Sequence, residues 1–129
     1  MIKALKVVMI VFGVVEILLG LMLVTMPEQM ASSAGADAAS GLLLYYIVSL
    51  GICLLALGVF IIIAAKDPLK HINWVKYAIV VCLLGALAGL YAVIRGYVTF
   101  GEAGMQIIMD AIFGIVFLAL YPYRAAKSS

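Results

Sequence analysis

The sequence predicts an all-α integral membrane protein, a bundle of four transmembrane helices. Of its 129 residues, 68% are hydrophobic and 11% are charged, whereas a soluble domain is about half apolar and about one quarter charged. Four long apolar runs are separated by shorter polar segments that contain Pro, Gly or Asp-Pro. The basic residues concentrate in alternate segments, as the positive-inside rule expects of a chain with an even number of spans.

The four runs define the helices of a single transmembrane domain. They cover residues 7–26, 42–65, 74–94 and about 103–121. A helix of twenty residues rises ~30 Å, which is the thickness of the hydrocarbon core. Pro27 and Pro122 follow the first and fourth runs, and Gly101 precedes the fourth, because these residue types end or exclude regular helix.

The first run has an alternative interpretation as a cleaved signal peptide, with Lys3 and Lys6 as its basic region. We predict a true span, because the apolar run is longer than a signal-peptide core and has Glu16 near its middle. The following segment, 27–41, is rich in Ala, Ser and Gly and is expected to form a short surface helix or a flexible excursion.

Basic residues fall almost entirely on one side of the predicted bundle. Seven of the eight Lys and Arg residues are on that side: Lys3, Lys6, Lys66, Lys70, Lys76, Arg124 and Lys127. The opposite side holds Glu28, Asp37, Glu102 and one basic residue, Arg95. The positive-inside rule therefore predicts that both termini are cytoplasmic in a multi-pass protein of the cell inner (plasma) membrane.

Glu16 is the most informative polar residue, since it lies ~13–14 Å into the first helix, close to the membrane midplane. An ionised carboxylate there costs at least ~2.5 kcal/mol, so such residues face the bundle interior and commonly mark function. Gly13 and Gly20 lie three and four residues away on the same face. Glu16 is either the proton or cation site of a small transporter or a protonated residue that holds helices together. The second interpretation is favoured, because no other polar residue is clearly placed at its depth.

Arg95 and Asp110 form a second polar pair in the sequence. Arg95 ends the third helix, and Asp110 is expected one or two turns into the fourth helix, near the membrane border. A short connection joins these helices, so we expect a salt bridge that fixes the hairpin rather than a substrate-binding pair. Gly114 follows Asp110 by four residues, which places the small and polar faces of this helix together.

Glycines mark the faces on which helices are expected to pack. Gly85 and Gly89 form a GxxxG pattern, and Gly51 and Gly58 form a similar stripe on the second helix. Small residues let helix backbones approach closely in lipid. Packing within the chain is favoured over contact with another chain.

No catalytic, cofactor-binding, metal-binding or nucleic-acid-binding motif is recognisable, so no cofactor and no nucleic-acid partner are expected. Cys53 and Cys82 lie inside apolar runs without a CxxC or Cys/His spacing. Small buried hydrophobic residues are the favoured interpretation. A redox dithiol is the alternative, since the two cysteines have similar predicted depths.

The layout resembles the DoxX-like superfamily of small four-helix membrane proteins, especially a branch of it that has no assigned activity. The similar features are the Gly-rich first helix ending at Pro27, the small-residue loop, the Gly51 and Gly58 stripe, the Arg95-Gly96 pair and the acidic Asp110. The resemblance implies a four-helix bundle and, from relatives that are subunits of quinone-linked oxidoreductases, an accessory role. The mid-helix Glu16 is also similar to that of small multidrug exporters, but the first loop is too long and the other helices do not match.

Two functional hypotheses follow from the sequence. The favoured one is an accessory or interaction subunit of a membrane complex, without its own catalysis, whose partners are the lipid bilayer and either further copies of itself, as a homo-oligomer, or other membrane subunits. The alternative is a proton-coupled small transporter or channel that uses Glu16.

Overall fold

A computed structural model describes residues 2–33 and 40–123, and this part of the chain is helical with no strand. The helices are α1 (Ile2–Thr25), α2 (Pro27–Ser33), α3 (Gly41–Ala64), α4 (Ile72–Ile94) and α5 (Phe100–Leu120). All except α2 are long and apolar enough to cross a membrane. The predicted all-α bundle of four spanning helices is therefore confirmed. Three of the charged residues used to predict the orientation lie outside the described residues: Asp37, Arg124 and Lys127.

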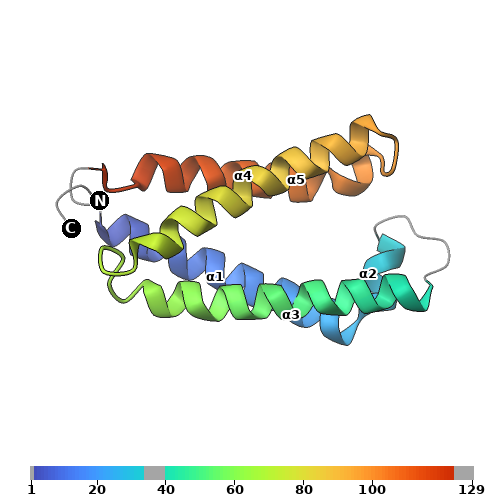
Figure 1. Ribbon diagram of the computed structural model, residues 1–129, viewed down its shortest axis with the longest axis horizontal. Helices are drawn as coiled ribbons and strands as arrows, with labels where there is room; N and C mark the ends of the chain where they lie inside the picture. Colours follow the sequence, from blue (N-terminus) through green and yellow to red (C-terminus); the bar gives the residue numbers. More distant parts are fainter. Residues whose placement is uncertain (1, 34–39, 124–129) are drawn as a thin grey trace.

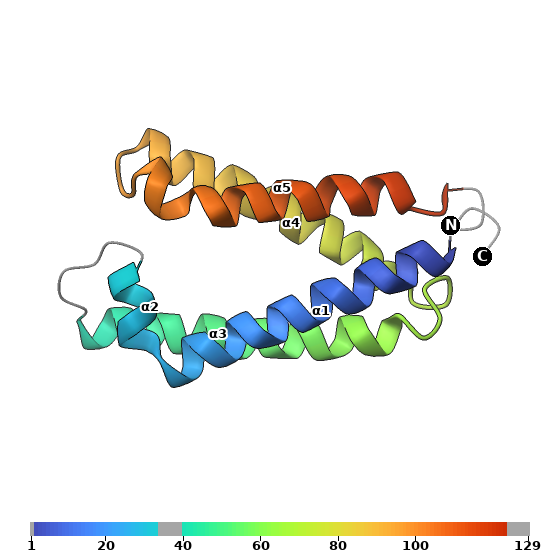
Figure 2. The same ribbon diagram turned by 180° about the vertical axis from the view of Figure 1, so that it is seen from behind.

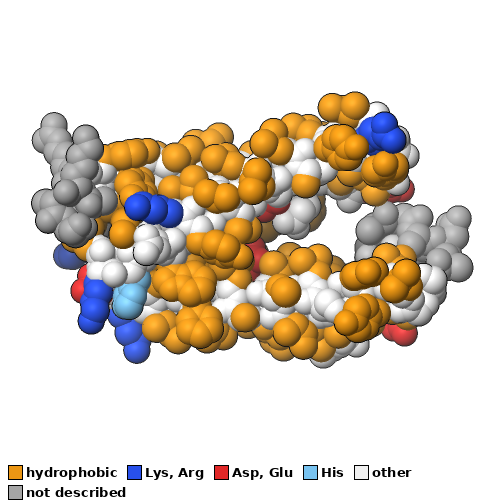
Figure 3. Space-filling view, viewed as in Figure 1, with side chains coloured by type: hydrophobic (Ala, Val, Ile, Leu, Met, Phe, Trp, Pro, Cys, Tyr) orange, Lys and Arg blue, Asp and Glu red, His pale blue; other side chains and the backbone are white. Residues whose placement is uncertain are grey.

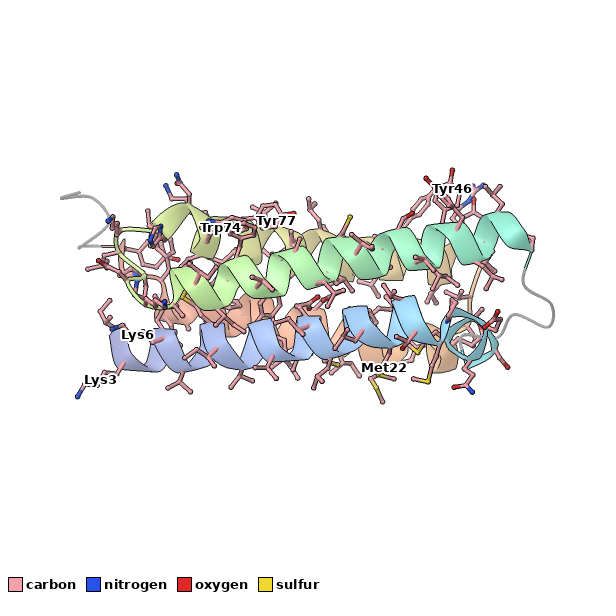
Figure 4. All side chains as sticks on the ribbon, turned by 90° about the horizontal axis from the view of Figure 1, so that it is seen from below. Lys3, Lys6, Met22, Tyr46, Trp74 and Tyr77 are labelled. Carbon is pink, nitrogen blue, oxygen red and sulfur yellow. The ribbon has the colours of Figure 1, made fainter. Side chains whose placement is uncertain are left out.

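The four long helices form two antiparallel layers (Figure 1), with α1 packed along α3 and α4 packed along α5. The view from behind shows the same two pairs (Figure 2). The start of α1, the end of α5 and the connection 65–71 lie at one end, which we call the lysine-rich end. Figure 4 shows Lys3 and Lys6 there, and Met22 and Tyr46 toward the opposite end.

The helix boundaries agree with the predicted runs to within two residues except at two starts. α1 begins five residues earlier than the apolar run, at Ile2, and α5 begins at Phe100, so that Gly101 lies inside its first turn. A capping box sets the start of α5. Thr99 Oγ1 accepts a hydrogen bond from the Glu102 N–H (3.2 Å), and Glu102 Oε2 accepts one from the Thr99 N–H (2.9 Å).

Four glycines bring α1 and α3 into backbone contact. Gly13 lies against Gly58, and Gly20 lies against Gly51: a Cβ at Gly58 would be 2.6 Å from the Gly13 carbonyl oxygen, and one at Gly20 would be 2.6 Å from that of Gly51. The glycines are seven residues apart on both helices, so the two contacts repeat along one antiparallel seam. We call this the glycine seam.

The hydrophobic core lies in the half of the bundle near the lysine-rich end. It unites side chains from all four long helices: Leu5, Met9, Phe12, Leu57, Ile61, Ala64, Ala65, Val75, Ala78, Ile79, Cys82 and Phe117. Toward the opposite end the two layers separate (Figures 1 and 2). The molecule is therefore closed at the lysine-rich end and open at the other.

The glycine seam predicts an unequal response to two identical substitutions. Gly58→Ala should lower the free energy of unfolding by about 1–3 kcal/mol, because the new methyl group would force apart tightly packed backbones. Gly41→Ala is the matched control, since no atom lies within 4 Å of a Cβ at Gly41. Unfolding by sodium dodecyl sulfate in mixed micelles, followed by circular dichroism, measures both. Equal stability of the two variants would contradict the seam.

Candidate functional site

A cleft of about 1060 Å³ lies between the two layers and is lined by side chains from all five helices. Most of its walls are apolar, but five polar side chains also line it: Glu16, Tyr97, Glu102, Gln106 and Asp110. Figure 3 shows the hollow between the layers, with acidic side chains at its inner end. We call it the acidic cleft.

Glu16 lies on the α1 wall of the acidic cleft and is only 7% exposed. It is the one buried charged residue in the described part of the chain. Within the same residues no group donates a hydrogen bond to its carboxylate. Every side-chain oxygen that is fully buried there does have a hydrogen-bond partner, so the carboxylate oxygens of Glu16 are not fully buried. The Glu16 carboxylate therefore reaches the open space of the cleft. Gly13 and Gly20 face α3 instead, so they position the helix rather than the carboxylate.

Asp110 faces the same cleft from the midpoint of α5, ten residues from each end. Its two oxygens accept hydrogen bonds from Gln106 Nε2, at 3.2 and 3.3 Å. On the other side it packs directly on Gly85, where a Cβ would lie 2.6 Å from Asp110 Oδ2. Asp110 is also close enough to Glu16 for an electrostatic interaction between the two carboxyl groups. Polar groups of α1 and α5 thus converge at mid-depth.

The predicted Arg95–Asp110 salt bridge is not formed between these two described residues, so that prediction is wrong. Arg95 is exposed, and its guanidinium carbon lies 5.7 Å from the centroid of the Tyr97 ring, within the range of a cation–π contact. Two physical reasons account for the difference. The early start of α5 moves Asp110 ~15 Å from that end of the helix. Gly96, with φ 77°, turns the chain at the end of α4 and keeps Arg95 at the rim.

Three phenylalanines pack together at the inner end of the acidic cleft, and one of them, Phe12, lines it. Phe12 lies one turn before Glu16 on α1, and its ring makes edge contacts with Phe113 (5.1 Å between centroids) and Phe117 (5.4 Å) of α5. Phe12 and Phe117 are fully buried. This aromatic floor separates the two carboxyl groups from the lysine-rich end.

The other residues singled out by sequence have packing positions. Gly89 contacts Ile107, and Gly114 lies against Leu83 and Cys82, so these glycines pack α4 on α5. Both cysteines are free. Cys82 is buried in the core as predicted, whereas Cys53 is exposed on the outer face of α3, so the prediction of a buried residue is wrong at that position.

Gln106 is the one polar neighbour of Asp110 that sequence reasoning missed. Its position four residues before Asp110, on the same helix face, was the available signal.

The chemistry of the acidic cleft favours cations. Three carboxylates and no Lys, Arg or His line it within the described residues. Among those residues no cluster of three or more His, Cys, Asp or Glu could hold a metal ion. The volume, about 1060 Å³, is slightly above the ~300–1,000 Å³ range of small-molecule sites.

Comparison of the chain with protein-family models, with curated proteins and with solved structures finds no significant match. The resemblance to the DoxX-like superfamily therefore stays a prediction.

The acidic cleft predicts which cysteines a water-soluble reagent can reach. In a variant with Cys53→Ala and Cys82→Ala, Ala88→Cys lies on the cleft wall. Leu87→Cys has the same depth but replaces a lipid-facing side chain that is 61% exposed and outside the cleft. A cationic methanethiosulfonate should label Ala88→Cys, and roughly tenfold faster than an anionic one, because carboxylates attract it. Equal labelling of the two positions would show that the cleft is not hydrated.

Proposed function

We propose that this chain is a small membrane carrier that takes a cation into the acidic cleft in exchange for a proton. The observation that carries the proposal is the Glu16 carboxylate. Its side chain is buried and receives no hydrogen bond from the described residues, and it lines the acidic cleft together with Asp110. An acidic residue inside the membrane usually has a partner, such as an opposite charge or a backbone carbonyl. A bound cation would supply the missing partner.

The exchange of charge follows from the same constraint. An ionised carboxylate is costly in a low-dielectric site unless a proton or a cation neutralises it. When a monovalent cation enters next to Glu16, one carboxyl proton leaves, and the charge of the cleft is unchanged. Proton and cation therefore compete for one site, which is the elementary requirement of an exchanger.

The arrangement of Asp110 and Gln106 supports the carrier over the structural role that the sequence favoured for Glu16. That preference depended on Glu16 having no polar neighbour at its depth. Asp110 interacts with Glu16 electrostatically and brings Gln106 with it through their hydrogen bonds. The aromatic floor adds a closed side to the site, on the side of the lysine-rich end.

An accessory subunit remains the second candidate, and the separation of the two layers favours it. A helix of another membrane subunit, or of a second copy, has room between α1/α3 and α4/α5 away from the core. The labelling experiment on Ala88→Cys distinguishes the two candidates. Protection in native membranes that disappears on purification supports the subunit, whereas labelling in both preparations supports the carrier.

Transport measurements test the carrier directly. Proteoliposomes that contain a pH-sensitive dye are exposed to inward gradients of sodium, potassium or tetraethylammonium. We expect at least one of these cations to drive proton efflux, and Glu16→Gln to reduce the rate at least tenfold, because the amide cannot exchange a proton. Asp110→Asn should also reduce it. The rate at low cation concentration should rise with pH, since fewer protons then compete for the cleft.

The controls address folding and the other titratable groups. Glu28→Gln removes an exposed carboxylate of α2 that does not line the cleft and should leave transport unchanged. Asp110, Glu102, Tyr97 and Cys82 are the titratable side chains on or beside the cleft, so the pH profile is compared between the wild type and Glu16→Gln. Proton efflux that is absent with every cation, or identical in the folded Glu16→Gln variant, would overturn the carrier.

We also propose that the lysine-rich end faces the cytoplasm, which the positive-inside rule supports. The described lysines all lie at or near that end, and α1 begins and α5 ends there. Reporter fusions at the two termini should both give the cytoplasmic signal. A periplasmic or extracellular signal from both fusions would reverse the orientation.

A further inference from the structure

A second hollow lies on the lipid-facing side of the bundle, between α3 and α4 near the lysine-rich end. It has a volume of about 590 Å³ and runs between residues 53–60 of α3 and 73–77 of α4. Phe60 lies toward the lysine-rich end of α3, and Cys53 lies at its middle, so the hollow extends ~10 Å along the helix. We call it the lateral groove. It is separate from the acidic cleft and shares no lining residue with it.

Aromatic rings form the wall of the lateral groove nearest the lysine-rich end. The rings of Phe60 and Trp74 are stacked, with centroids 5.4 Å apart and planes 1° from parallel. Trp74 also makes an edge contact with Tyr77, at 5.8 Å. Phe60 and Tyr77 are each 50% exposed. Figure 4 shows Trp74 and Tyr77 in the half of the molecule that carries Lys3 and Lys6, with Trp74 nearer that end, and Trp favours the level of the lipid headgroups.

Basic and polar side chains accompany the α4 wall. Lys70 precedes Trp74 by four residues, Lys76 precedes Tyr77 directly, and both lysines are exposed. The amide of Asn73 lines the groove and has no hydrogen-bond partner among the described residues. Figure 3 shows basic side chains gathered at this end beside large hydrophobic ones. Asp67 is the only acidic residue of the connection 65–71, and its Oδ1 accepts a hydrogen bond from the backbone N–H of Lys70 (3.3 Å).

We propose that the lateral groove binds one acyl chain of an anionic phospholipid, with the phosphate held by Lys70, Lys76 and Asn73. The lining of the groove is mainly apolar, and the exposed Lys70 and Lys76 flank its α4 wall in the sequence, which together match the charge pattern of an anionic lipid. Basic pockets between transmembrane helices bind such headgroups, and lysine stems extend along apolar surface to bring the ammonium group to the headgroup level. A zwitterionic lipid matches the apolar part but not the charge. The proposal is independent of the carrier function.

Trp74 provides the test, because it is the only tryptophan of the chain and lines the groove. The protein is reconstituted in phosphatidylcholine that contains increasing fractions of brominated phosphatidylglycerol, or of brominated phosphatidylcholine, with bromine in the upper half of the chain. Bromine quenches tryptophan fluorescence on contact. We expect the anionic lipid to quench Trp74 at low mole fraction and to saturate, whereas the zwitterionic lipid should quench in proportion to its mole fraction.

Matched variants separate a site from general attraction to the membrane surface. Lys70→Gln together with Lys76→Gln should abolish the preference for the anionic lipid, each lysine contributing on the order of fivefold. Lys3→Gln together with Lys6→Gln removes the same number of charges at the same end but away from the groove, and should retain the preference. Ala56→Leu places bulk on the groove wall without changing charge and should reduce saturable quenching.

Three outcomes would overturn the proposal. The first is quenching by the anionic lipid that only follows its mole fraction. The second is an equal loss of preference in the Lys3/Lys6 and Lys70/Lys76 variants, which would indicate a diffuse charge effect. The third is undiminished saturable quenching in Ala56→Leu. Because proton exchange is measured separately, failure of the lipid site leaves the carrier proposal standing, and failure of the carrier leaves the lipid site standing.

Discussion

The close approach of α1 and α3 through their glycines is the contact on which the rest of the structure depends. In lipid there is no hydrophobic drive between helices, so association relies on van der Waals packing and backbone proximity. The glycine seam supplies both along α1 and α3. Between α4 and α5, Gly85, Gly89 and Gly114 make room for side chains of the neighbouring helix. Each layer therefore satisfies its own packing. The two layers contact each other in the hydrophobic core, where large side chains from all four long helices pack together. The space between the layers beyond that core is the acidic cleft.

The capping box at the start of α5 then determines the depth of Asp110 in the cleft. The Thr99–Glu102 box starts α5 early enough to place Asp110 at mid-helix, and Gly85 leaves room for its carboxylate against the α4 backbone. A longer residue at position 85 would occupy the position of that carboxylate. Glu16 comes from the other layer and has no such donor as Gln106 within the described residues. The two acids are consequently inequivalent, one supported by an amide and one open to the cleft.

The composition and the apolar runs were sufficient for the fold, because four segments that are too hydrophobic for water have few alternatives to spanning a bilayer. Polar contacts between helices were harder to predict from the sequence. Whether Asp110 meets Arg95 or Glu16 depends on the register of α5, and a shift of three residues at its start changes both its depth and the direction it faces. The sequence contains that information at Thr99 and Glu102, but only as a capping signal. The separation of the layers is a tertiary property with no comparable local signal, so the cleft could not be predicted.

The two layers are also consecutive in the chain, since the first ends at Ala64 and the second begins at Ile72. The α1/α3 hairpin leaves the ribosome before α4 and α5, and N-terminal units generally fold first during synthesis. This order allows the two hairpins to insert one after the other and then dock through one interface. Docking is then the step that encloses Glu16, because its side chain lies on the wall of α1 that meets the second layer across the acidic cleft.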